Sequence, residues 1–145
     1  MLNVLDGIIN QNRFDVDVTD GVITTGIEGK WVAATSVNGV TKYDFQANAV
    51  AAFCVWTESH KDGTPGFTPD AIYLKKVAVL SGHFRAETDL FDGDPQVGEF
   101  LKTTSTGNLA VAGEGDNSVA KVLKAKYSKT FMGTAIEVIE IQAAV

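Results

Sequence analysis

The sequence is short of several residue types, and each shortage excludes a class of protein. A single cysteine, Cys54, excludes an internal disulfide framework. Three prolines beside 14 glycines indicate many turns rather than a disordered chain. The formal net charge of −6 argues against binding along a phosphate backbone, which requires a basic surface. No apolar run approaches the roughly 20 residues of a membrane span. The N-terminus also lacks the basic start of a signal peptide. We therefore expect a protein folded in the cytoplasm, with neither nucleic acid nor membrane as a partner.

Apolar stretches bounded by turn residues recur about every ten residues, which is typical of an all-β barrel or sandwich. Phe14, Val16 and Val18 alternate with aspartates, and an Asn-Gly turn at Val37–Gly39 separates two candidate strands. Further strands are expected at 49–56, which is apolar without a break, and at 75–80, 83–88 and 134–142. Residues 119–127 fit a strand or a short helix, and their position between turns at hairpin spacing favours a strand. Residues 128–133 are expected to be a turn.

The stretch from Gly93 to Ser118 has the densest turn signals. We predict a strand at 97–104, a turn at 105–108, a hairpin partner at 109–112 and a second turn at 113–118. The chain length suits one domain. The sequence therefore predicts a small β-barrel or β-sandwich with long surface loops, in which residues 15–145 form a single β domain and residues 1–14 an N-terminal arm.

Few residues suggest chemistry. Cys54 lies in the most apolar run, where a thiol stays protonated. The two histidines, His60 and His83, lie far apart in the sequence, and no phosphate-binding glycine motif is present. Acidic residues at 89–94 and 114–116 do not match a calcium-loop spacing, and turn formation accounts for them. We expect no enzymatic activity, cofactor or metal, although a small hydrolase using Cys54 or the histidines remains an alternative.

Two other features suggest protein contacts. The segment from Trp56 to Asp70 carries His60, Phe67 and two prolines, and we expect it to be a long surface loop. Its aromatic residues fit a protein contact, a sugar-binding platform or a cap on one end of the core. Lysines 121, 124, 126 and 129 fit a solvated strand that resists aggregation, or a surface that docks on an acidic protein.

The order of turns and strands in "GDPQVGEFLKTTSTGNL", together with "KVAVLSGHFRAETDLFD", resembles the capsid decoration (cement) proteins of tailed bacteriophages. The resemblance covers about residue 49 to the C-terminus and, more faintly, the start of the chain. It implies a small β-barrel protein that binds the outer capsid surface and braces neighbouring capsid subunits, often as a trimer. The implied partners are the major capsid protein and further copies of the chain, in a virion assembled in the host cytoplasm.

The N-terminal segment is apolar but too short for its own core. We expect it to be an arm that packs on a neighbouring copy or on the capsid. The candidate protein-contact residues are therefore Leu2, Val4, Leu5, Ile8, Ile9, Trp56, His60 and Phe67. Two alternatives remain open, namely a tail or spike component of the virion and a carbohydrate-binding β domain.

Overall fold

The computed structural model describes residues 2–15, 28–58 and 76–144, and these form an all-β protein. Within those ranges the strands are β1 (Leu2–Asp15), β2 (Trp31–Val37), β3 (Val40–Asp44), β4 (Phe53–Glu58), β5 (Lys76–Thr88), β6 (Phe100–Thr103), β7 (Leu109–Val111), β8 (Ala120–Phe131) and β9 (Thr134–Ala144). They belong to one sheet with the order β3-β2-β4-β5-β9-β8-β6-β7, and β1 pairs additionally with β5. Every pairing between these strands is antiparallel.

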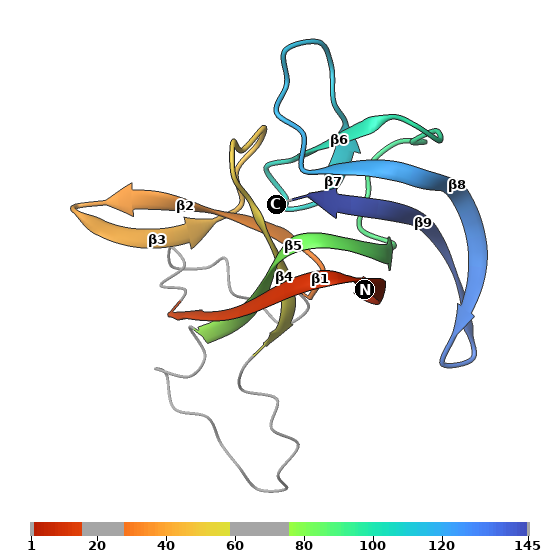
Figure 1. Ribbon diagram of the computed structural model, residues 1–145, viewed down its shortest axis with the longest axis horizontal. Coiled ribbons are helices and arrows are strands. Elements are labelled where there is room, and N and C mark those ends of the chain that lie inside the picture. Colours follow the sequence, from red (N-terminus) through yellow and green to blue (C-terminus); the bar gives the residue numbers. More distant parts are fainter. Residues whose placement is uncertain (1, 16–27, 59–75, 145) are drawn as a thin grey trace, which may run out of the picture.

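Strand β5 joins the two halves of this sheet. One of its edges is paired with β1 along its whole length, from Lys76 to Thr88. Its other edge is paired first with β4, as far as Leu80, and then with β9 from His83 onward. The sheet therefore divides at β5 into a lobe of β2, β3 and β4 and a lobe of β6 to β9. Figure 1 shows β2 and β3 at the left and β6 to β9 at the upper right.

Two glycines allow the backbones of the paired strands β1 and β5 to approach each other closely. Gly7 and Gly82 have φ angles of 129° and 117°, which residues with side chains rarely adopt. A Cβ atom at Gly82 would lie 2.3 Å from the carbonyl oxygen of Ile8, and one at Gly7 would lie 2.4 Å from that of His83. Because both clashes are with backbone, neither position can take a side chain unless the two strands separate.

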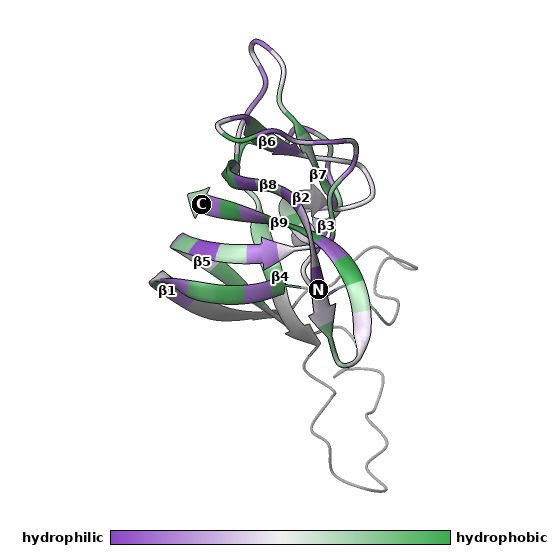
Figure 2. Ribbon diagram, turned by 90° about the vertical axis from the view of Figure 1, so that its right-hand side faces the viewer, coloured by the Kyte–Doolittle hydropathy of each residue, from purple (hydrophilic) through white to green (hydrophobic). Residues whose placement is uncertain are grey.

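The core lies between the two lobes. Alternate residues of β5, including Leu80, Phe84 and Ala86, are almost fully buried, and Figure 2 shows hydropathy alternating along this strand. The core cluster comprises Trp31, Ala33, Ala49, Ala52, Cys54, Leu80, Phe84, Ala86, Leu101, Leu109, Val119, Ala120, Val122, Ile139, Ile141 and Ala143. Both lobes contribute side chains to this cluster, so neither lobe has a hydrophobic core of its own.

Contacts across the core hold the lobes together without closing the sheet. The Trp31 amide donates a hydrogen bond to the Gly107 carbonyl, at 2.8 Å. The segment before β4 docks on β6 through Thr103, whose hydroxyl donates to the Gln46 carbonyl and accepts from the Ala49 amide. The sheet is not closed into a barrel, so of the two predicted architectures the sandwich-like one fits the structure.

The hairpins of the sequence prediction are confirmed. Strands β2 and β3 meet at Asn38–Gly39, and β6 and β7 form the predicted hairpin within residues 93–118. Other predictions were wrong in their boundaries. Strand β4 begins only at Phe53, after a segment that is not a strand, and β8 continues through the predicted turn to Phe131. The two strands predicted at 75–80 and 83–88 are one strand, β5. Gly82 does not form a turn there but lets the backbone of β1 approach closely.

The N-terminal segment also differs from the expectation of a separate arm. Residues 2–14 lie within strand β1, which is hydrogen-bonded along β5. This pairing satisfies the backbone hydrogen-bonding groups along one edge of β1. Leu2, Val4 and Ile9 pack against the core cluster. The alternation predicted for residues 14–18 falls only partly on β1, and residues 16–18 lie outside the described residues.

The close approach of β1 and β5 at Gly82 leads to a prediction about stability. Gly82→Ala should lower the free energy of unfolding by about 2 kcal/mol more than Gly93→Ala, because Gly93 also has a positive φ but no heavy atom within 4 Å of the position that a Cβ would occupy. Urea denaturation of the two variants provides the measurement. Equal losses would contradict the close approach of the two strands.

Candidate binding surfaces

The five N-terminal contact candidates divide into two groups in strand β1. Leu2, Val4 and Ile9 are partly buried against the core, whereas Leu5 and Ile8 are exposed by 41% and 77%. The division follows from a register irregularity between Val4 and Asp6, which interrupts the period-of-two alternation of the strand. Only Leu5 and Ile8 therefore remain available for contact with another molecule.

The outer edge of β1 carries backbone groups without a strand partner in the part of the chain that the structure describes. Its position beside β5 is fixed on the outer face by Arg85, which donates to Asp6 at 2.9 Å and to Glu140 of β9 at 2.6 Å. Strand edges of this kind can accept a further strand from another chain.

For the other three contact candidates, Trp56, His60 and Phe67, the structure gives no side-chain position near this edge. Trp56 lies in β4, where the structure describes its backbone only. His60 and Phe67 lie outside the described residues. The surface loop predicted from Trp56 to Asp70 is wrong at its start, because residues 56–58 belong to strand β4. The rest of that segment lies outside the described residues, so it and the sugar-binding alternative stay predictions.

A cluster around Glu87 joins β1 and β8 across the outer face of the sheet. The Glu87 carboxylate is 7% exposed and accepts hydrogen bonds from Asn3 Nδ2 at 2.7 Å, from the Tyr127 hydroxyl and from Lys129 Nζ. Burial alone would raise the pKa of Glu87, but these hydrogen bonds and the charge of Lys129 outweigh it and lower the pKa to about 2. Burial, together with the same contact, raises the pKa of Tyr127. The cluster is a structural clamp that anchors the β8–β9 hairpin.

The four lysines of β8 do not form a free basic stripe. Besides Lys129, which binds Glu87, Lys126 lies 3.8 Å from carboxylate oxygens of both Asp94 and Glu137. Lys121 and Lys124 lie over aromatic rings, those of Phe100 and Tyr127 respectively. Irregularities in the β8–β9 pairing displace these residues from the simple alternation that the sequence predicted.

The tip of the β8–β9 hairpin lies at the end of the turn that the sequence predicted for residues 128–133, and the exposed apolar side chains on it were not anticipated. Met132 and Gly133 occupy a two-residue turn with φ angles of 48° and 82°, the left-handed pair that a type I′ turn requires. The β2–β3 hairpin uses Asn38 and Gly39 for the same turn. Methionine is poorly suited to the left-handed conformation, and the Met132 side chain is 91% exposed, beside the half-exposed Phe131. A methionine followed by glycine between two strand patterns was the signal available in the sequence.

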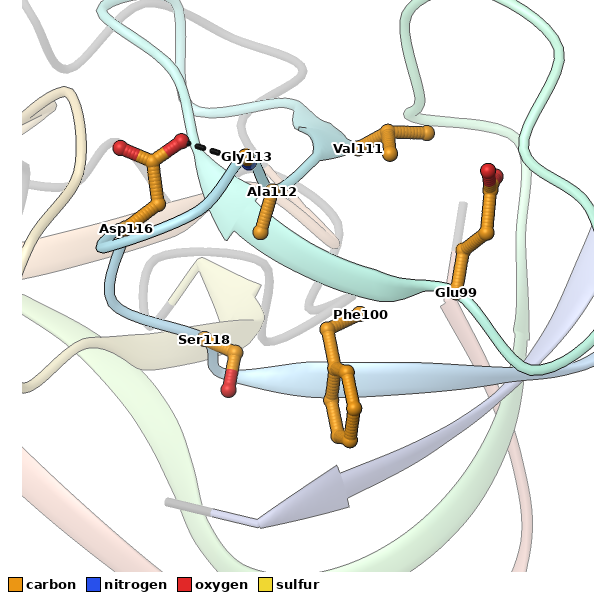
Figure 3. A pocket seen from close by; sticks show the side chains of 7 residues that line it. All are labelled: Glu99, Phe100, Val111, Ala112, Gly113, Asp116 and Ser118. Carbon is orange, nitrogen blue, oxygen red and sulfur yellow. Dashed lines mark hydrogen bonds between the residues drawn. The ribbon is translucent and has the colours of Figure 1, made fainter.

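A pocket of about 370 Å³ lies at the other end of the same lobe, between β6, β7 and the start of β8. It is lined by Glu99, Phe100, Val111, Ala112, Gly113, Asp116 and Ser118. Figure 3 shows Glu99 and Asp116 at opposite ends, with Ala112 and Phe100 between them. Phe100 and Val111 are exposed by 54% and 38%, so the pocket offers apolar surface between two carboxylates.

Among the described residues, the structure does not bring Cys54 and His83 together, and it shows no metal-binding cluster. Cys54 is fully buried, and burial raises the pKa of its thiol. His83 is exposed and alternates with the buried Leu80 and Phe84, which places it on the opposite face of β5 from Cys54. Among residues 2–15, 28–58 and 76–144, no group of three histidine, cysteine, aspartate or glutamate side chains could hold a metal ion.

The acidic turns have structural roles. Asp116 accepts hydrogen bonds from Lys102 Nζ and from the Gly113 amide, both at 2.7 Å, and these contacts lower its pKa. Asp92 accepts a hydrogen bond from Asn108 Nδ2 at 2.8 Å.

In the described part of the chain, no helix is long and apolar enough to cross a membrane. A comparison with protein-family models finds none that matches this chain, and a comparison with curated proteins finds no match either.

The Glu87 cluster predicts an acid-dependent loss of stability. Because the folded pKa lies near 2 and the unfolded one near 4.5, the contribution is complete above pH 4.5 and is lost as the pH falls toward 2. Glu87→Gln should lower the unfolding free energy by about 3 kcal/mol at pH 7, and by progressively less below pH 4.5. The measurement is chemical denaturation from pH 7 to pH 2. Glu137→Gln, at a side chain that is 68% exposed, is the control and should leave the pH dependence unchanged.

The burial of Cys54 predicts a thiol that reacts only after unfolding. The native protein should react with a thiol-specific reagent at least about a hundredfold more slowly than the unfolded chain, because reaction requires exposure of a side chain that is 0% exposed. Rapid labelling of the folded protein would instead return Cys54 to consideration as a nucleophile.

Proposed function

We propose that the chain is a virion structural protein that binds the outer surface of a phage capsid and stabilises it as a decoration protein, without enzymatic activity. The sequence resemblance supports the capsid as the partner. The observation that supports a binding role is the outer edge of β1, a strand of 14 residues that includes the exposed Leu5 and Ile8.

Strand addition suits this edge. A strand from a capsid subunit would satisfy the backbone groups of β1 in the manner of a sheet ladder, while Leu5 and Ile8 would supply apolar contacts. Because β1 is already ordered against β5 and clamped at Asn3, little conformational entropy is lost on binding. Repetition of the contact over a symmetric shell would turn a modest interface into a strong one.

The proposal includes self-association, with a trimer as the expected oligomer. It differs from the alternative of a tail or spike component in copy number. Quantitative mass spectrometry of purified particles should find the chain at a simple ratio to the most abundant shell protein. A handful of copies per particle would instead support the tail or spike position, and absence from the particle would overturn the virion role.

The β1 edge is tested by substitution at its most exposed apolar residue. Ile8→Lys should weaken binding to purified shells about tenfold or more, because a lysine cannot replace the apolar contact. Binding is measured by sedimentation of the protein with shells that lack it. Thermal unfolding should be unchanged, since Ile8 contributes little to the core.

Val50→Lys is the matched control for Ile8→Lys. Val50 is 85% exposed and lies between β3 and β4, away from β1 in sequence and pairing. The control should bind shells like the unmodified chain. Equal binding of all three proteins would show that the β1 edge is not the shell contact.

A further inference from the structure

The β8–β9 hairpin displays apolar side chains where the fold does not require them. Both Phe131 and Met132 lie at its tip, exposed by 46% and 91%. A type I′ turn favours asparagine or glycine at its first position, and this chain uses asparagine in the equivalent turn at Asn38. Keeping methionine there costs folding energy and exposes apolar surface, a combination that indicates a role outside the folding of the chain.

The pocket beside β6 and β7 complements this tip. Its apolar part is formed by Phe100, Val111 and Ala112, and its volume of about 370 Å³ can hold a side chain as large as methionine or phenylalanine. Its two charged lining residues, Glu99 and Asp116, are carboxylates (Figure 3). Lys102 is paired with Asp116, and Lys121 lies over the ring of Phe100.

The partner follows from the apolar match rather than from charge. Residues 120–144 carry four lysines and two glutamates, but Lys129 is paired with Glu87, and Lys126 lies near Asp94 and Glu137. The pocket carboxylate Asp116 is likewise paired with Lys102. An exposed apolar tip and an apolar pocket on the same chain therefore point to a second copy as the partner.

One chain cannot fill its own pocket with its own tip. Strand β8 begins two residues after Ser118, which lines the pocket, and ends at Phe131, which precedes the tip. Twelve residues of strand span about 40 Å. Figure 1 shows the hairpin tip at the opposite end of this lobe from β6 and from the loop between β7 and β8.

We infer that the Phe131–Met132 tip of one copy inserts into the pocket lined by Phe100, Val111 and Ala112 of a second copy. Such a contact is heterologous, so each copy gives a tip and receives one, and the association closes into a ring if the rotation between copies permits. The inference deepens the self-association in the proposed function and does not depend on binding to a shell. The Glu87 clamp supports it, because Tyr127 and Lys129, close to the tip, are held to Glu87 of β5 and through it to Asn3 of β1.

Met132→Asn is the decisive variant, because asparagine suits the left-handed turn and removes the apolar side chain. It should fold at least as stably as the unmodified chain, yet self-associate about tenfold or more weakly. Val111→Lys, in the pocket, should weaken self-association similarly. Sedimentation velocity of the full chain, from micromolar to millimolar concentration, provides the measurement.

A mixture of the two variants tests the direction of the contact. Met132→Asn copies keep an intact pocket and Val111→Lys copies keep an intact tip, so the mixture should form a one-to-one heterodimer while each variant alone stays monomeric. Failure of the mixture to associate would overturn the heterologous contact. A chain that is monomeric at millimolar concentration would overturn the inference, while shell binding through β1 could still be observed.

Val50→Asn separates this pocket from the other described one. Val50 helps to line a second hollow of about 510 Å³ with Tyr43 and Phe53, which has no charged side chain in its lining. The variant should self-associate like the unmodified chain. If Val50→Asn rather than Val111→Lys abolished the association, the tip would bind a different surface and the inference would be wrong.

Discussion

Strand β5 makes backbone hydrogen bonds to β1 along one edge and to two successive partners, β4 and β9, along the other. This arrangement gives the two lobes a common strand, and the side chains of Leu80 and Phe84 then face a core to which both lobes contribute. The change of partner coincides with Ser81 and Gly82, where β1 also approaches most closely. The packing of the core and the position of the β1 edge, which we propose as a binding surface, both depend on this junction.

The two surfaces differ in what they offer. The β1 edge presents backbone groups, which any extended partner can satisfy, with two apolar side chains for selectivity. The hairpin tip presents the exposed side chains of Phe131 and Met132 on a tight turn. An edge suits a contact with a different protein, and a knob that matches a pocket on the same chain suits contacts between copies. The two can therefore operate together without competing for residues.

Much of the fold was predictable because turn chemistry is local. The Asn38–Gly39 turn and the β6–β7 hairpin follow from residues that favour those backbone angles wherever they occur. Strand β1 was not predictable, since its irregularity near Leu5 breaks the alternation and its partner lies more than sixty residues away. The sequence suggested a break between two strands at Ser81 and Gly82. A glycine that lets two strands approach closely cannot be distinguished, from sequence alone, from a glycine that forms a turn. The predicted β6–β7 hairpin brings the lining residues of the pocket together, all of them between Glu99 and Ser118, but no sequence pattern shows that a hollow remains between their side chains.

The shared strand also bears on how the chain acquires its structure. The pairing of β1 with β5 joins residues as distant as Leu2 and Thr88, and the second half of β5 finds its other partner only in β9, the last of the described strands. Pairing of this kind must close long loops before it yields stability, which makes folding slow. On the ribosome, β5 would emerge with an open edge and wait for more than forty further residues. The growing chain therefore spends its synthesis with its central strand half paired, when a strand from a neighbouring copy could take the place of β9.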